Sequence, residues 1–126
     1  MLLHILRMLS SMKVYVSGPI TGLPLDVAEE RFRSACSHVE SFGHETVCPW
    51  DNGVPVEASW REHLGADIAM LLGCDAIYLM DGFHMSKGAQ LELVVAKHQC
   101  MKVFVSDSIP PELRPAGSVF LSFSEV

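Results

Sequence analysis

Residues 13–22 read KVYVSGPITG, a β-branched run that ends abruptly at Gly18-Pro19. Short apolar runs of this kind return at residues 75–80 and 101–105, and longer segments with helical periodicity lie between them. This alternation is typical of βαβ units. We therefore predict a single-domain α/β fold, a Rossmann-like or flavodoxin-like doubly wound sheet of about five mostly parallel strands.

Further elements are expected between these runs. Two more strands are predicted at residues 45–48 and 118–123. A helix is expected from Asp26, as N-cap, to Gly43, and another from a Ser59–Glu62 capping box to Gly73. The last predicted helix spans residues 88–99, and its apolar face is expected to contain Leu91, Val94, Val95 and His98.

The composition limits the functional classes. The chain has 126 residues, 49% of them hydrophobic, and a net charge of -6 with only nine Lys and Arg. A nucleic-acid polymer is not expected as a partner, since such binding depends on many cations. One small anion remains possible, because a helix N-terminus can bind a phosphate whatever the net charge. The four cysteines form no CxxC pair and there is no HExxH, so we expect no metal, no cofactor and a reducing, cytoplasmic location.

Residues 1–11 are apolar but too short to span a bilayer, and no small-residue cleavage site follows them. We interpret them as an N-terminal extension to a domain at residues 12–126, and expect no membrane association.

Two carboxylates occupy unexpected positions. Asp67 has the spacing of an apolar helical stripe and therefore points inward, where burial would raise its pKa and keep it able to donate a proton. The alternative is a structural Asp that caps a loop or pairs with Arg61 or His63. Glu92 lies at the border of the buried face of its helix, facing the mouth of the sheet, although a surface Glu near a helix N-terminus would look the same.

The remaining candidates are aromatic or lie in loops. Tyr15, inside the first strand, is by default a core residue whose hydroxyl needs a partner. Trp50 and Phe83 follow strands, where they are either core residues or an aromatic wall for a base, whereas Trp60 is expected in the core. The 18–22 loop matches neither GxGxxG nor a Walker A motif, which gives no support to a dinucleotide or triphosphate site.

The stretches KVYVSGPITG, ADIAMLLGCDAIYLM and SKGAQLELVVA together resemble the nucleoside 2-deoxyribosyltransferase superfamily. They are most similar to its small phage-type relatives and to the deoxynucleoside 5'-monophosphate N-glycosidases. The resemblance implies that Glu92 is the nucleophile, that Asp67 donates a proton to the base, and that Tyr15 orients the nucleophile. It also implies a 5'-phosphate site that contains Ser86, and further contacts are expected from Gly18, Ile20, Thr21, Gly22 and Gly88.

The expected reaction is cleavage, or transfer, of the N-glycosidic bond of a (deoxy)nucleoside 5'-monophosphate through a glycosyl-enzyme intermediate. A non-catalytic nucleotide-binding module is the alternative, and a scaffold that binds through the apolar extension is a third. The bulky stretch at residues 81–85 departs from the family pattern and leaves the substrate open. The small-molecule substrate is expected to bind a homodimer or higher homo-oligomer, in line with the apolar surplus.

Overall fold

The structure, a computed structural model, describes residues 11–123 of the chain. The first ten residues of the predicted extension lie outside these described residues. Four parallel strands form one sheet in the order β2-β1-β3-β4. They are β1 (Lys13–Ser17), β2 (Glu45–Val47), β3 (Ala76–Leu79) and β4 (Lys102–Val105). The predicted α/β class with a parallel sheet is confirmed.

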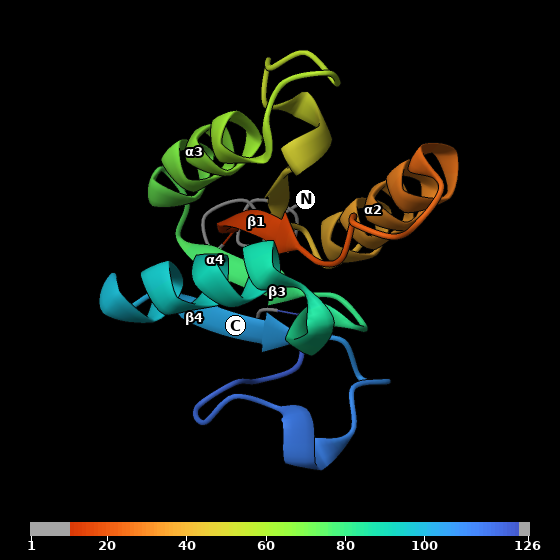
Figure 1. The fold of residues 1–126 in the computed structure, drawn as a ribbon. Coiled ribbons are helices and arrows are strands. Elements are labelled where there is room, and N and C mark those ends of the chain that lie inside the picture. The colour runs from red at the N-terminus through yellow and green to blue at the C-terminus, as the bar shows by residue number, and fades with distance from the viewer. Residues whose placement is uncertain (1–10, 124–126) are drawn as a thin grey trace.

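Helices cover both faces of the sheet (Figure 1). The helix α2 (Leu25–Glu40) lies on one face, while α3 (Trp60–Leu72) and α4 (Lys87–His98) lie on the other. Three short 3-10 turns connect these elements: η1 (Pro49–Asp51), η2 (Phe83–Met85) and η3 (Pro111–Leu113). We call the two faces the α2 side and the α3–α4 side of the sheet.

The alternation of β1 divides its side chains between these two sides. Val14 and Val16 belong to the cluster on the α2 side, together with Phe32. Tyr15 belongs to the cluster on the α3–α4 side. Because β1 leads to α2 and β3 leads to α4, the chain continues to opposite faces of the sheet after these neighbouring strands. The carboxyl ends of β1 and β3 therefore form a topological switch point, where ligands bind in folds of this class.

The predicted fifth strand is reduced to a single bridge. Val119 pairs in parallel with Phe104, and its N–H donates to the Val103 carbonyl at 2.9 Å. Further along, the ring of Phe123 lies 4.8 Å from the ring of Phe42, which follows α2. The chain thus leaves the edge of β4 after one residue, because its aromatic contact lies beyond the strand.

Local corrections concern helix starts and faces. The helix α2 begins two residues earlier than predicted, since Pro24 and not Asp26 is its N-cap, and Asp26 lies in its first turn. Ser59 does cap α3, since its Oγ accepts the Glu62 N–H at 3.2 Å. Trp60, predicted to be in the core, is 50% exposed because it begins the first turn of α3.

The buried face of α4 also differs from the prediction. Ala89, Glu92 and Ala96 are buried, while Leu91 and Val94 are exposed. Small side chains allow the helix to approach the sheet, so the close-packed face is the one with alanines. Glu92 therefore lies within the buried face of α4.

Candidate active site

The strand β1 presents two hydroxyl groups to the α3–α4 side of the sheet. Tyr15 and Ser17 are two residues apart, so their side chains leave the strand on the same face. Both residues are fully buried. A buried hydroxyl needs a hydrogen-bond partner, and both find the same one.

That partner is the carboxyl group of Glu92. Tyr15 Oη donates to Glu92 Oε2 at 2.6 Å, and Ser17 Oγ donates to Glu92 Oε1 at 2.7 Å. Glu92 is only 5% exposed and no salt bridge to it is found among the described residues. Two neutral donors, one on each oxygen, thus fix the carboxyl group at the carboxyl end of β1.

The helix α3 supplies the second carboxylate. Asp67 is 7% exposed, as its position in the apolar stripe predicts. Its Oδ1 accepts a hydrogen bond from Asn52 Nδ2 at 2.9 Å, and the same nitrogen lies 3.1 Å from His63 Nδ1. Pairing with Arg61, one structural alternative, is not observed among the described ion pairs. Asp67 is held instead by a neutral amide.

The two carboxyl groups influence each other. The pKa of Glu92 is raised to about 7, mainly by burial and also by the charge of Asp67, against the opposing effect of the hydrogen bonds from Tyr15 and Ser17. Burial also raises the pKa of Asp67, while the Asn52 hydrogen bond and His63 lower it. Burial thus favours the protonated form of both carboxyl groups.

Hydrogen bonding opposes this effect of burial at both carboxyl groups. Glu92 accepts two bonds that favour its charged form, while Asp67 accepts one. The pKa of Tyr15 is strongly raised, first by burial and then by the charge of Glu92, so its hydroxyl stays protonated and able to donate. Glu92, with a pKa of about 7, can therefore be ionised in the neutral range while both of its oxygens are held by protonated hydroxyl groups.

Two loops border this group. Gly18 is buried, and a Cβ there would lie 2.8 Å from Met80 Cβ, so close packing of the loop on β3 requires glycine. Ile20 packs on the α2 side, while Thr21 and Gly22 are exposed. Ser86 caps α4, since its Oγ accepts the Ala89 N–H at 3.2 Å. The Ser86 hydroxyl hydrogen remains available for an anion near Gly88.

The two candidate aromatic residues are placed apart. Phe83 is buried in the core cluster of the α3–α4 side with Tyr15 and Ala89. The ring of Trp50 packs edge-on against Phe32 on the α2 side, at 6.4 Å between ring centroids. Its Nε1–H is buried and has no acceptor among the described residues. The Phe83 side chain has no polar atom, so the Trp50 indole N–H is the one polar side-chain group of this pair.

Sequence reasoning missed Ser17 and Asn52. Ser17 was detectable, because it lies two residues after Tyr15 and must share its face. Asn52 carried no comparable signal, since its contact with Asp67 depends on the path of the loop after β2. His63, considered above only as a structural partner of Asp67, contacts the amide that holds Asp67.

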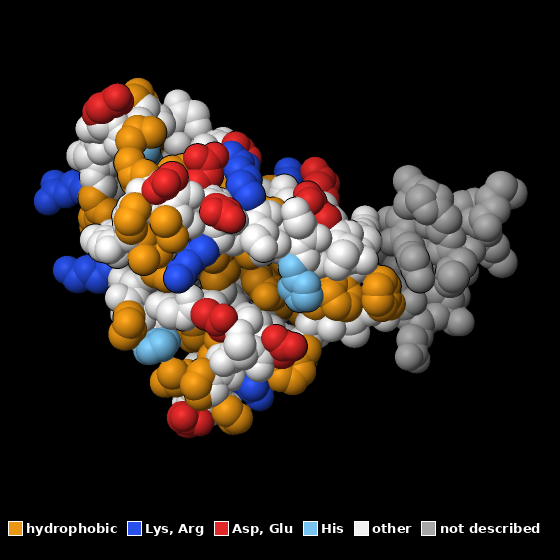
Figure 2. Space-filling view, turned by 90° about the vertical axis from the view of Figure 1, so that its right-hand side faces the viewer, with side chains coloured by type: hydrophobic (Ala, Val, Ile, Leu, Met, Phe, Trp, Pro, Cys, Tyr) orange, Lys and Arg blue, Asp and Glu red, His pale blue; other side chains and the backbone are white. Residues whose placement is uncertain are grey.

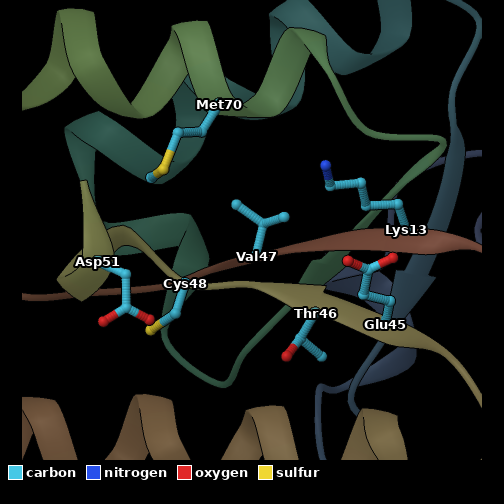
Figure 3. A pocket seen from close by; sticks show the side chains of 7 residues that line it. All are labelled: Lys13, Glu45, Thr46, Val47, Cys48, Asp51 and Met70. Atoms are coloured by element: carbon cyan, nitrogen blue, oxygen red, sulfur yellow. The ribbon is translucent and has the colours of Figure 1, made fainter. Parts of the chain in front are cut away.

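Two surface hollows lie elsewhere. One, of about 360 Å³, borders the edge strand β2. Figure 3 shows Val47 directed towards Met70 there, with Thr46 and Cys48 on the other side of the strand. A second, of about 900 Å³, lies between α2 and the ends of β3 and β4. Neither hollow is lined by Glu92 or Asp67. The candidate site is therefore identified by its buried carboxyl and hydroxyl groups and not by a surface hollow.

Other classes of site find little support in the described part of the chain. No group of three or more His, Cys, Asp or Glu side chains is arranged to hold a metal ion there. Acidic, basic and apolar side chains are interspersed on the face shown in Figure 2. Between residues 11 and 123, no helix is long and apolar enough to cross a membrane.

Comparison with known proteins gives a family and a shared fold. Residues 12–105 match the family described as a domain of unknown function, DUF4406. The chain belongs to this family. No curated protein matches it.

Three solved structures share the fold of this DUF4406 protein. A 2-desoxiribosyltransferase from Leishmania mexicana is 21% identical, with a TM-score of 0.56 over 78% of this chain and 67% of the other. A conserved protein from Enterococcus faecalis V583 is 17% identical, with a TM-score of 0.57 over 91% and 82%. The CMP N-glycosidase BcmB from Clostridium botulinum is 16% identical, with a TM-score of 0.54 over 86% and 85%. The fold implied by the sequence resemblance is thus confirmed.

Proposed function

We propose that this protein cleaves the N-glycosidic bond of a (deoxy)nucleoside 5'-monophosphate, with Glu92 as the nucleophile. The observation that carries the proposal is a buried carboxyl group held by Tyr15 and Ser17 on separate oxygens, beside a second buried carboxyl group. Such a pair is costly to bury without a function. Two neighbours in fold, a 2-desoxiribosyltransferase and a CMP N-glycosidase, support this class of reaction.

The first step forms a glycosyl-enzyme ester. A Glu92 oxygen attacks the anomeric carbon, and the bond from that carbon to the base nitrogen breaks. Asp67 transfers its proton to the departing base, which leaves as a neutral molecule. Because the transition state resembles an oxocarbenium ion, the negative charge on Glu92 stabilises it as it develops.

The second step releases the sugar. Water attacks the anomeric carbon, its proton passes to the Asp67 carboxylate, and Glu92 leaves as a carboxylate. A second base could replace water, which would make the reaction a transfer. Tyr15 and Ser17 support both steps, because each stabilises one Glu92 oxygen whenever that oxygen carries charge.

The 5'-phosphate is assigned to the N-terminus of α4. Ser86 and the Gly88 N–H lie at this end of the helix, where the helix dipole favours an anion, and the Gly18 to Gly22 loop supplies the opposite wall. Trp50 is not assigned to the base, because its ring packs against Phe32 on the α2 side, whereas Tyr15 and Glu92 lie on the α3–α4 side.

Exposed apolar side chains and free cysteines support an oligomeric state and a location for the protein. Trp60, Leu72, Leu91 and Val94 are large apolar side chains exposed on α3 and α4, which supports a homodimer or higher homo-oligomer. All four cysteines are free, which supports a reducing, cytoplasmic location.

A direct test is incubation with a panel of deoxynucleoside 5'-monophosphates, followed by chromatography for free base. The wild-type protein is expected to release base from at least one of them, and Glu92→Ala is expected to release none while remaining folded. Near wild-type turnover by Glu92→Ala would refute the assignment of the nucleophile. Nucleotide binding without any base release would instead favour a non-catalytic binding module.

A further inference from the structure

We infer that Asn52 is a positioning residue, whose hydrogen bond to Asp67 determines which carboxyl oxygen carries the transferable proton. His63 in turn fixes the orientation of the Asn52 amide. This inference rests on the proposed function. The residues involved form a chain of hydrogen bonds from the loop after η1 to Asp67. None of them lies on α4, the helix that carries Glu92.

The orientation of the Asn52 amide follows from a backbone donor. The Val54 N–H lies 2.9 Å from Asn52 Oδ1. A backbone N–H can only donate, so the atom that faces it must be the amide oxygen. The amide nitrogen therefore faces the other way, towards Asp67 Oδ1 at 2.9 Å and His63 Nδ1 at 3.1 Å.

The same logic assigns the tautomer of His63. The amide nitrogen of Asn52 carries two hydrogens and accepts nothing, so His63 Nδ1 must accept. The ring hydrogen is then on Nε2, which lies 3.4 Å from the Val56 carbonyl oxygen. Each amide hydrogen has one acceptor, and the amide is held at three points.

This arrangement distinguishes the two oxygens of Asp67. Oδ1 accepts the Asn52 hydrogen bond, which leaves Oδ2 as the oxygen free to carry the proton. The titratable group that acts on Asp67 is His63 from its own helix, while Asp67 itself raises the pKa of Glu92 on α4 and of Tyr15 on β1. Among its neighbours, Asn52 gives the largest effect that lowers the pKa of Asp67.

The test is the pH dependence of kcat/KM in Asn52→Ala. Asp67 must be protonated to act, so its ionisation sets the alkaline limb of the profile. Loss of a hydrogen bond that favours the carboxylate should move this limb to higher pH by about one unit, and should lower the maximum rate. A residue with only a structural role would lower the rate without moving the limb.

Asp51→Asn is the matched control. Asp51 precedes Asn52 in the chain, but its carboxylate is exposed and pairs with Arg33 at 2.8 Å. This variant should leave the alkaline limb at its wild-type position. An equal displacement in Asn52→Ala and Asp51→Asn would show that the loop as a whole, rather than the amide, is responsible, and would overturn the inference.

A second measurement does not require turnover. NMR titration of the Asp67 side-chain carboxyl carbon should give a higher pKa in Asn52→Ala than in the wild type. An unchanged pKa would overturn the inference even if the wild type releases base. Absence of base release by the wild type, together with the expected NMR shift, would refute the proposed function and leave the role of Asn52 intact.

Discussion

Alternate side chains of β1 point to opposite sides of the sheet and make different kinds of contact there. On the α2 side, Val14 and Val16 pack against Phe32 in an apolar cluster. On the α3–α4 side, Tyr15 and Ser17 bind a buried carboxyl group. The first arrangement contributes stability through apolar burial, whereas the second retains charge and hydrogen-bonding capacity inside the protein. We therefore propose that β1 contributes only to the core on the α2 side and contributes to catalysis on the α3–α4 side, which also has an apolar cluster of its own.

After the complete loss of base release expected for Glu92→Ala, the next largest effect is expected at Asp67. Asp67→Asn keeps the shape of the side chain but removes the proton, and should lower base release by about a hundred- to ten-thousand-fold. Substrates whose base leaves readily without protonation should lose least. The measurement is kcat/KM across a series of leaving bases, and a uniform loss would point to a structural role.

Glu92→Gln should show that the buried, ionised Glu92 carboxylate lowers the stability of the folded protein. The pKa of Glu92 is raised from 4.5 to about 7, so the folded state prefers the protonated form. Protonation of Glu92 therefore stabilises the folded state fully below pH 4.5, and this stabilisation is lost as the pH rises through 7. A shift of this size corresponds to about 3 kcal/mol.

Thermal unfolding of Glu92→Gln should therefore occur at a higher temperature than that of the wild type at pH 8, with little difference at pH 4. Greater stability of the wild type at pH 8 would contradict the idea that ionised Glu92 is costly to bury.

Ser86→Ala should separate phosphate binding from helix capping. Loss of one hydrogen bond to a charged group should lower kcat/KM on the monophosphate by roughly ten- to a hundred-fold, and barely change it on the nucleoside. Ser59→Ala is the control, because Ser59 caps α3 with the same geometry. Equal losses on both substrates would mean that Ser86 only caps α4.

The smallest catalytic effect is expected on the α2 side. Val39 is fully buried in the cluster there, and Val39→Ala should lower the free energy of unfolding by about 2 kcal/mol. The kcat/KM of the folded protein and its pH profile should not change. A displaced pH profile would show that the two sides are not independent.

The sequence predicted what depends on local pattern. The β-branched runs located β1, β3 and β4, and the inward position of Asp67 followed from helical spacing. The face of α4 was predicted wrongly, because Leu91 and Val94 outweigh alanines in any count of hydrophobicity. Alanines at Ala89 and Ala96 pack closer to the sheet, and the resulting rotation buries Glu92.

What could not be predicted depends on contacts between distant residues. Glu92 and Ser17 are 75 residues apart in the chain, and no local rule pairs them. Asn52 reaches Asp67 only because η1 directs the loop after β2 towards α3. The predicted extra strand failed for a similar reason, since contacts of Phe123 beyond β4 draw the chain away from the sheet edge.

The central claim, that Glu92 bonds covalently to the sugar, is tested most directly by mass spectrometry of rapidly quenched enzyme and substrate. We predict that wild-type protein gains the mass of one sugar 5-phosphate residue, located by peptide fragmentation on Glu92, and that Glu92→Gln gains none. Base release by the wild type without any adduct, or an adduct on a residue other than Glu92, would contradict the account.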